Sequence, residues 1–315
     1  MRILVTGGAG FIGANTCRAF TARPEVERVT VLDDLSSGDL ANLDGVGVEF
    51  VKGSILDRDL LADLAADATT VIHLAARPSV PRSLTDPVAS HTVNATGTLN
   101  VLEACRETAP QVILASSSSV YGNRPEPYKH EDLPTRPLSP YGASKLAAEA
   151  YALAYAESYG LPVLPFRFFN VYGPMQAADH AYAAVIPAFV SAALRGRPVP
   201  IHGDGNQARD FTYVESVTDV LVDAAVRRVT SRRPVNLAFG TRVSLLYLRR
   251  LLSEVLDRPI EADFLPPRTG DIRESQASPD LLRDLFPDVR PVPLEDGLRM
   301  TAAWFDPAAV PPTGA

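Results

Sequence analysis

The sequence predicts an α/β protein in which a doubly wound parallel sheet is followed by a smaller mixed α/β domain. Short β-branched runs alternate with helical patterns through the first half of the chain, which is typical of parallel strands joined by crossover helices. A glycine-rich segment directly follows the first run and opens the first helical pattern. Beyond about residue 170 the alternation loosens and proline and glycine recur, which indicates a different architecture there.

The elements of the predicted sheet follow one another at short intervals. Strands are expected at residues 2–6, 28–33, 48–52, 70–74, 111–116 and 163–168. Helical periodicity covers residues 11–20, 57–65, 88–106 and 141–159. Residues 112–115 are purely apolar, as expected for a strand of a sheet that helices cover on both faces.

These elements place the sheet domain at residues 1–169 and the second domain mainly at residues 170–305. The run at 234–238 has the composition of one further sheet strand, so the second domain need not be contiguous in sequence. The tail at 306–315 is rich in proline and alanine and is expected to be mobile.

Composition and charge exclude several classes of function. The 315 residues carry a net charge of −7, whereas a nucleic-acid-binding protein would show a basic face. No apolar run reaches the roughly 18 residues of a membrane span, and the first one ends at glycines rather than at a cleavage site. We therefore expect neither a membrane anchor nor a signal peptide.

Cys17 and Cys105 fall in helical segments and are expected to be reduced core thiols of a cytoplasmic protein without a metal site.

The segment TGGAGFIG at residues 6–13 has the pattern of a dinucleotide-binding turn, so the sheet is predicted to be of the Rossmann type. Gly7 would allow the tight turn, Gly10 would let the backbone approach a pyrophosphate, and Gly13 would let the helix pack against the strand. The amino end of the helix would then offer free N–H groups and a positive dipole to the phosphates. Because a strand and a helix flank the glycines in the required order, a turn without a ligand is the weaker interpretation.

Two acidic residues at the end of the second strand favour NAD over NADP. Asp33 stands about 20 residues after the glycines, where a carboxylate would hold the ribose hydroxyls of the adenosine. A 2′-phosphate would meet both Asp33 and Asp34 with no arginine nearby, a repulsion on the order of 1–4 kcal/mol at 4 Å. We therefore expect NAD as the cofactor.

A tyrosine and a lysine form the candidate catalytic pair. Tyr141 and Lys145 lie four residues apart on one predicted helix and hence on one of its faces. The serine cluster at 116–119 follows the fifth strand, at the edge where such sheets bind ligands. A phenol is a poor base, but a nearby ammonium and a cationic nicotinamide would favour the phenolate. Tyr141 could then take a hydroxyl proton while hydride leaves the same carbon, with a serine bonded to the same oxygen.

Together these segments resemble the extended short-chain dehydrogenase/reductases that act on nucleotide sugars, most closely the UDP-hexose 4-epimerases. The resemblance covers nearly the whole chain. Its further marks are DDLSSG at 33–38, HLAA at 73–76, SSSSVYG at 116–122, RFFNVYGP at 167–174, GDG at 203–205, RDF at 209–211 and RTGDIR at 268–273. These motifs are specific for the family and less specific for the member.

The resemblance implies a role for each matching residue. Ser117, Tyr141 and Lys145 would be catalytic, with Tyr141 as the acid and base. NAD would be held by Gly7, Gly10, Phe11, Ile12, Gly13, Asp33, Asp34, Ser37, Gly38, Ser54, Ile55, Leu74, Ala75, Ala76, Tyr141, Lys145 and Phe168. The UDP-sugar would be held by Arg82, Ser118, Ser119, Asn170, Val185, His202, Arg209, Arg268, Asp271 and Ser275. Within that set, Asn170 and Arg209 match diphosphate positions, and Ser275 matches the residue that gates the sugar pocket.

The residues beside the catalytic serine favour epimerisation. Related 4,6-dehydratases carry Asp-Glu there and uronate decarboxylases carry Glu, because a carboxylate supplies the extra proton chemistry. This chain has Ser118 and Ser119 instead. A 4-epimerase that acts through a 4-keto sugar is therefore expected, with UDP-glucuronate decarboxylase or another oxidoreductase or dehydratase of the family as the alternative. A non-enzymatic cofactor sensor is disfavoured because all three catalytic residues are present.

The sequence constrains the identity of the hexose and the oligomeric state less than it constrains the reaction. A serine at position 275 predicts a roomy pocket, so UDP-glucose, UDP-N-acetylglucosamine and UDP-glucuronate all stay open. Relatives dimerise through helices that match 88–106 and 141–159, so a homodimer is expected by analogy. Apolar positions on these helices are Val101, Ala104, Ala147 and Tyr151, although periodicity alone does not separate a dimer contact from packing on the sheet.

Overall fold

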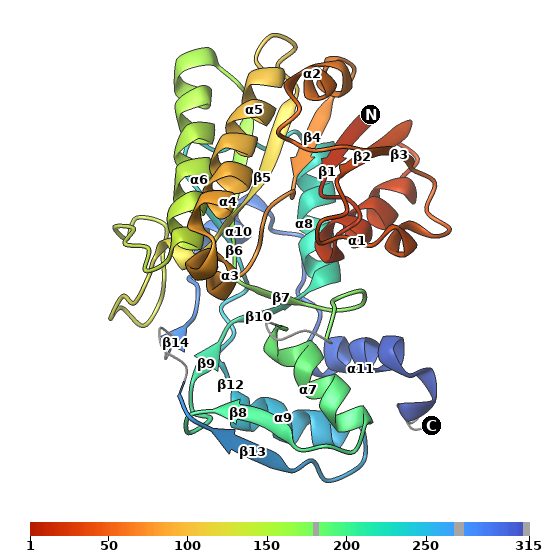
Figure 1. Cartoon of the computed structure of the whole chain (residues 1–315), viewed down its shortest axis with the longest axis vertical. Coiled ribbons are helices and arrows are strands. Elements are labelled where there is room, and N and C mark those ends of the chain that lie inside the picture. Colours follow the sequence, from red (N-terminus) through yellow and green to blue (C-terminus); the bar gives the residue numbers. More distant parts are fainter. Residues whose placement is uncertain (179–182, 268–273, 311–315) are drawn as a thin grey trace.

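The computed structural model describes residues 1–178, 183–267 and 274–310. Its centre is a parallel sheet of seven strands in the order β11-β6-β5-β4-β1-β2-β3 (Figure 1). The strands are β1 (Arg2–Thr6), β2 (Arg28–Asp33), β3 (Glu49–Lys52), β4 (Thr70–His73), β5 (Gln111–Ser117), β6 (Val163–Phe168) and β11 (Val235–Leu237). The strand order reverses between β1 and β4, and ligands of such sheets bind outside the carboxyl ends of the strands at this point.

Helices cover both faces of this sheet. One face carries α1 (Phe11–Thr21) and α8 (Val214–Val226), and the other carries α2 (Arg58–Ala66), α5 (Gly97–Ala104) and α6 (Pro140–Tyr159). Because side chains alternate along a strand, Val5 packs in the same cluster as Phe20 of α1, whereas its neighbour Leu4 packs in the cluster of Leu61 from α2. The predicted doubly wound sheet is confirmed.

The predicted helix at 88–106 is not regular. The segment folds as α4 (Pro87–His91), a π-helical turn (Thr92–Thr96) and α5, and a further short helix, α3 (Val80–Thr85), precedes it. Asp86 separates α3 from α4 and caps α4, because its carboxylate accepts a hydrogen bond from the Ala89 N–H at 3.0 Å. Val101 of α5 is only 1% exposed and packs in the core, so of its two alternatives, dimer contact or packing on the sheet, the structure shows the second.

The second region is built from short strands and from helices below the carboxyl ends of the sheet (Figure 1). Its strands pair as β7 (Asn170–Tyr172) with β10 (Phe211–Tyr213), β8 (Val199–His202) with β13 (Ala262–Leu265), and β9 (Ala208–Arg209) with both β12 (Val243–Ser244) and β14 (Glu274–Ser275). Its helices are α7 (Val185–Leu194), α9 (Leu245–Val255) and α11 (Leu294–Phe305). The chain returns three times from this region to the large sheet, as α8, as β11 and as α10 (Asp280–Leu285), which packs on β11.

The structure bears on the expectations for the cysteines, for membrane spans and for the tail. Cys17 and Cys105 are both free and buried, and burial raises the pKa of each thiol to about 12. No helix in the described part of the chain is long and apolar enough to cross a bilayer. The tail begins with a short 3₁₀ helix (Pro307–Ala309), and its last residues, 311–315, lie outside the described part.

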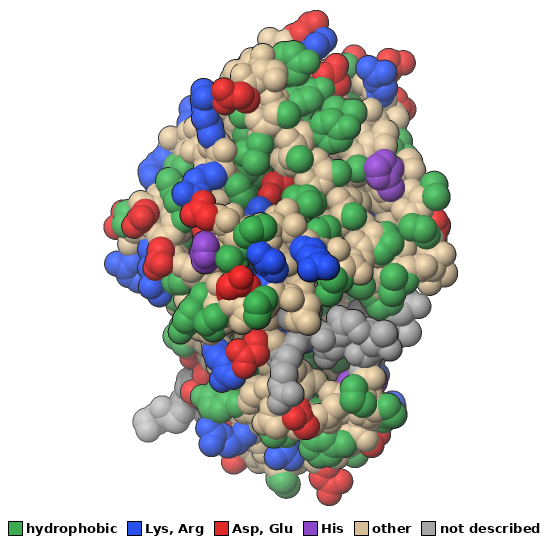
Figure 2. All heavy atoms as spheres, turned by 90° about the vertical axis from the view of Figure 1, so that its left-hand side faces the viewer, with side chains coloured by type: hydrophobic (Ala, Val, Ile, Leu, Met, Phe, Trp, Pro, Cys, Tyr) green, Lys and Arg blue, Asp and Glu red, His purple; other side chains and the backbone are tan. Residues whose placement is uncertain are grey.

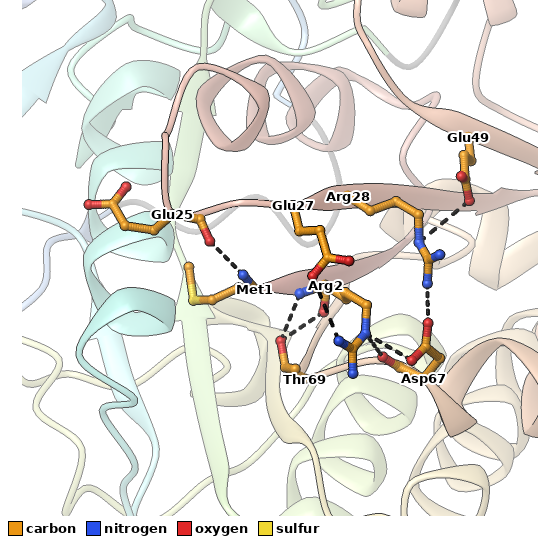
Figure 3. Close-up of polar contacts among 8 residues, drawn as sticks. All are labelled: Met1, Arg2, Glu25, Glu27, Arg28, Glu49, Asp67 and Thr69. Atoms are coloured by element: carbon orange, nitrogen blue, oxygen red, sulfur yellow. Dashed lines mark hydrogen bonds and ion pairs between the residues drawn. The ribbon is translucent and has the colours of Figure 1, made fainter.

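The amino ends of the strands carry an exposed cluster of ion pairs (Figure 3). Arg2 pairs with Glu27 at 3.7 Å and with Asp67 at 2.8 Å. Arg28 pairs with the same Asp67 and with Glu49 at 3.6 Å. The cluster ties the starts of β1 and β2 to the loop before β4, at the end of the sheet opposite to the predicted site.

Candidate active site

The glycine-rich turn between β1 and α1 leaves no room for side chains. Gly7 has φ +76°, and a Cβ atom there would lie 2.6 Å from the Ala75 amide nitrogen. A Cβ atom at Gly13 would lie 2.1 Å from the Gly7 carbonyl oxygen. The turn therefore packs backbone against backbone, as a cradle for a pyrophosphate requires, and Phe11 and Ile12 begin the helix whose amino end faces it.

Asp33 lies at the end of β2, where the ribose of NAD would bind. Its carboxylate accepts hydrogen bonds from the Ala9 N–H at 2.9 Å and from the Leu35 N–H at 2.8 Å. Both bonds come from backbone, so the side chain is fixed in place before any ligand arrives. A backbone cradle beside an oriented carboxylate fits NAD.

A cavity of about 420 Å³ adjoins this end of the cofactor site. Its lining includes Asp34, Ser37, Ala76, Arg77 and Arg82. The two arginines correct the expectation that no arginine lies near the acidic pair, because the loop after β4 brings them there from a distant part of the sequence. The structure also places Arg82 in this cavity and not in the pocket beside Tyr141, where a sugar-binding residue was expected.

The other predicted cofactor residues surround the same crevice. The N–H groups of Leu74 and Ala75 bond to the backbone oxygen and the hydroxyl of Thr6, at 3.0 and 3.4 Å. The Ile55 carbonyl accepts a hydrogen bond from Asn100 at 3.2 Å. Three predicted cofactor residues remain. The Ser54 hydroxyl accepts a hydrogen bond from the Leu56 N–H, and Gly38 packs on the Ala9 backbone. Phe168 is buried at the end of β6.

The catalytic residues come from β5 and from the start of α6. Ser139 caps α6 by accepting from the Gly142 N–H at 3.1 Å, and Tyr141 and Lys145 occupy the first turns. Lys145 is buried and donates from Nζ to the Ala115 carbonyl at 2.9 Å. The Ser117 hydroxyl oxygen accepts from the Ser119 N–H at 3.1 Å, and Ser117 is hydrogen-bonded to Tyr141. The three predicted catalytic residues therefore lie together.

The electrostatics of Tyr141 and Lys145 are dominated by burial. Burial raises the pKa of its phenol above the usual value, and the hydrogen bond with Ser117 opposes the rise only in part. Burial also lowers the pKa of Lys145 to about 8, so this ammonium is itself poorly solvated. The protein's own groups thus do not by themselves make Tyr141 a base, and the predicted lowering of its pKa requires the cationic nicotinamide together with Lys145.

Two polar residues that sequence reasoning missed hold this arrangement. Asn94 of the π-helical turn donates to the Ser144 hydroxyl at 2.9 Å, and Ser144 in turn donates to the Tyr141 carbonyl at 2.8 Å. His73 bridges Thr6 and Thr98 at 2.7 and 2.9 Å. Burial, with a smaller effect of the Lys145 charge, lowers the His73 pKa to about 3, so the ring is neutral.

Glu149 was also missed, although it stands four residues after Lys145 on the same helix. It is 3% exposed and accepts from the Ser116 hydroxyl at 2.7 Å. Arg167 of β6 donates to both of its oxygens, at 2.7 and 3.0 Å, and stacks over the Tyr121 ring. The repeated spacing Tyr-x-x-x-Lys-x-x-x-Glu was the available signal, since it places all three residues on one helix face.

A second cavity, of about 490 Å³, lies between Tyr141 and the second region. Its lining brings together five predicted residues from separate elements, namely Tyr141, Asn170, Val185, His202 and Arg209. Ser118, Ser119 and Ser275 lie outside this lining, and Arg268 and Asp271 lie outside the described residues. The lining thus combines the catalytic tyrosine with an amide and a guanidinium, which suit a diphosphate.

A doubly wound sheet with a dinucleotide turn and a Ser–Tyr–Lys set defines an oxidoreductase-type enzyme of the short-chain dehydrogenase/reductase class. Residues 3–238 match the NAD dependent epimerase/dehydratase family. The chain belongs to this family, and NAD is its cofactor.

Three similar proteins illustrate the range of the family. The UDP-glucose 4-epimerase of Mycolicibacterium smegmatis is 38% identical, with 97% of this chain and 98% of the relative covered. The structure of the UDP-N-acetylglucosamine 4-epimerase from Methanobrevibacter ruminantium, in complex with UDP-N-acetylmuramic acid, superposes with a TM-score of 0.91 at 36% identity and covers 98% of both chains. The dTDP-glucose 4,6-dehydratase of Streptomyces niveus is 38% identical over 97% of this chain and 93% of the relative.

Proposed function

We propose that this enzyme interconverts the C4 epimers of a UDP-hexose through a 4-keto intermediate. The observation that carries the proposal concerns carboxylates around the reacting groups. Among the described residues that line the pocket beside Tyr141 there is no aspartate or glutamate, and serines occupy positions 117–119. Elimination of water from the sugar would need a further acid and base. Glu149 does not supply them, because Ser116 and Arg167 occupy both of its oxygens.

The chemistry follows from the hydrogen bonds of the catalytic residues. Bound NAD would supply the hydride acceptor for C4 and later the donor to the opposite face. Tyr141 would take the proton of the C4 hydroxyl and return it. The Ser117 oxygen accepts from the Ser119 N–H, and its own proton, which is directed to Tyr141 in the absence of substrate, would turn to the C4 oxygen when the sugar is bound. Since burial alone raises the pKa of Tyr141, the charges of Lys145 and of the oxidised cofactor must together stabilise the phenolate.

Epimerisation also requires that the nucleotide stay bound while the hexose turns. We assign residues 1–169 mainly to the cofactor and residues 170–305 mainly to the nucleotide sugar. Asn170 and Arg209 of the pocket lining would hold the diphosphate, and Val185 and His202 would line the base. This leaves the hexose between the diphosphate anchor and Tyr141, free to present either face.

Product analysis tests the reaction. The purified enzyme is incubated in D₂O with UDP-glucose, UDP-N-acetylglucosamine and UDP-glucuronate, and the products are followed by NMR and mass spectrometry. We expect a C4 epimer of unchanged mass, formed without added cofactor and without deuterium at C4, because the hydride is returned from the enzyme. Loss of water would identify a dehydratase, and loss of carbon dioxide would identify a decarboxylase.

The sugar specificity is proposed from Ser275. This serine lies opposite Arg209 in the β14–β9 pair, and it offers little bulk at the position that gates the pocket in the resembling epimerases. We propose that an N-acetyl or carboxylate substituent is therefore tolerated. Ser275→Tyr should depress turnover of the substituted hexose far more than turnover of UDP-glucose. Ser275→Ala is the matched control, and equal losses for all sugars would contradict the gate.

A homodimer through α4 and α6 is proposed as well. Leu84, Val88 and Tyr151 are 64%, 73% and 42% exposed on this side of the molecule. Figure 2 looks onto that side and shows hydrophobic side chains among the charged ones. Sedimentation should give twice the monomer mass, and Val88→Asp should shift it to the monomer; an unchanged mass for the variant would exclude this face.

A further inference from the structure

One buried carboxylate of the second region takes no part in the chemistry above. Asp210 lies between β9 and β10 and is 0% exposed. It follows Arg209 directly, so its backbone is continuous with a proposed diphosphate residue. Its side chain and its backbone together bond to three other segments of the chain, at residues 170, 240–241 and 275–277.

The carboxylate joins two loops that are distant in sequence. One oxygen accepts from the Gly240 N–H and from the Ala277 N–H, each at 3.1 Å. The other oxygen accepts from the Thr241 hydroxyl at 2.8 Å. Each of these partners donates, which is the arrangement that suits an ionised carboxylate.

The backbone of Asp210 holds two further proposed substrate residues. Its N–H donates to the Ser275 carbonyl at 2.8 Å. Its carbonyl accepts from the backbone N–H of Asn170 at 3.2 Å and from the Asn170 side chain at 3.1 Å. Asn170, Arg209 and Ser275 are therefore all bonded to Asp210, either through hydrogen bonds or through the chain itself.

We infer that Asp210 is a positioning residue. It holds the strand of Arg209 against the segments of Asn170 and Ser275, and it thereby sets the affinity of the site for the diphosphate. This role is independent of hydride transfer. This inference rests on the proposed function, because it concerns how that function's substrate is held. No pocket-lining role is involved, since Asp210 and Thr241 both lie outside the lining of the cavity. Loss of the carboxylate should weaken binding of the diphosphate and leave the geometry of Ser117, Tyr141 and Lys145 intact.

The test separates binding from chemistry. The probe is UDP, titrated by calorimetry into the NAD-loaded enzyme, and kcat and KM are measured with the substrate identified above. In Asp210→Asn an amide N–H₂ replaces one acceptor, so UDP should bind at least about tenfold more weakly, the loss expected for one hydrogen bond to a charged acceptor. KM should rise in parallel, while kcat and NAD content stay close to those of the wild type.

Thr241→Val serves where Asp210→Asn fails to fold. It removes one hydrogen bond to the carboxylate from a residue outside the pocket, so UDP should bind more weakly by a smaller factor than in Asp210→Asn. Where Asp210→Asn does fold, most of the Thr241 effect should vanish in the double variant, because the other acceptor that the described residues offer this hydroxyl is the Phe211 carbonyl, at 3.3 Å. Ser116→Ala is the matched control: it removes a hydrogen bond from the buried Glu149 and should leave UDP affinity unchanged.

The outcomes are distinct. Unchanged UDP affinity in folded Asp210→Asn or Thr241→Val overturns the inference. A lower UDP affinity also overturns it if the Ser116→Ala control shows the same loss, or if the variant loses NAD as well. A wild-type enzyme that does not bind UDP overturns the proposed function together with the inference that rests on it.

Discussion

The two ends of the central sheet both use arginine–carboxylate pairs, but in opposite surroundings. At the amino ends Arg2 and Arg28 share Asp67, and the three side chains are 36%, 37% and 56% exposed (Figure 3). At the carboxyl ends Arg167 and Glu149 are only 4% and 3% exposed. Water and salt screen the exposed pairs, whereas a buried charge that loses its partner stays desolvated. We therefore expect the arginine–carboxylate pairs to contribute little to stability at the amino ends of the sheet and much more at the carboxyl ends.

The location of the buried pair explains why it is retained. Glu149 lies on the helix that carries Tyr141 and Lys145, and it also bonds to Ser116, the neighbour of Ser117. Arg167 extends the connection to β6. The pair thus joins the catalytic helix to two sheet strands, whereas the cluster around Asp67 touches none of the proposed catalytic residues.

The largest effect is expected from Tyr141→Phe, which changes the carboxyl end without touching the ion pair. Activity should fall by about 10²–10⁴-fold, as is typical for the loss of a general acid and base. UDP affinity and the denaturation midpoint should stay near the wild-type values. Steady-state turnover and calorimetry check this, and near-normal turnover would show that another group moves the proton.

Glu149→Gln breaks the buried pair. The guanidinium of Arg167 would keep its charge with one partner oxygen fewer, so the free energy of unfolding should fall by about 3–5 kcal/mol. Urea denaturation measures the loss, and kcat should fall with it because Ser116 and α6 are no longer joined. A variant as stable as the wild type would mean that the buried pair is no stronger than the exposed ones.

His73→Gln tests the neutral part of the same network. The pKa of His73 is about 3 in the folded protein and near 6.5 when unfolded, so only the unfolded state gains a proton between these values. Wild-type stability should therefore fall as the pH drops below about 6.5, by up to about 1.4 kcal/mol per unit from this residue. The variant lacks that slope, so the stability difference between the two should narrow from neutral to acidic pH. A constant difference would contradict the assignment.

Asp67→Asn should have the smallest effect. It removes the shared carboxylate of the exposed cluster and leaves Arg2 and Arg28 in contact with water and with Glu27 and Glu49. The denaturation midpoint should decrease slightly at low salt, and the decrease should disappear when added salt screens the wild-type pairs. Activity should not change, and a loss comparable to that of Glu149→Gln would remove the distinction between the two ends.

The sequence predicted what local spacing determines. The sheet strands agree with the predicted ranges to within one residue at each end, because alternation and turn residues mark them directly. The Ser–Tyr–Lys set was also found, since a strand end and a helix face suffice to bring it together. The role of Asn94 was not predicted, because Asn94 lies in a π-helical turn and periodicity assumes a regular helix. The placement of Arg82 was not predicted either, because this residue lies on a separate short helix, α3.

The return of the chain to the large sheet has a consequence for folding. β11 pairs with β6 at Phe166, Arg167 and Phe168, so a segment from the second half of the sequence covers what would otherwise be the outer edge of the sheet. A chain cut after residue 169 would expose the unpaired N–H and C=O groups of a nearly all-apolar strand, which is a template for association with other chains. The cofactor half therefore depends on a late segment for its solubility, and during synthesis its edge stays open until Val235–Leu237 has emerged.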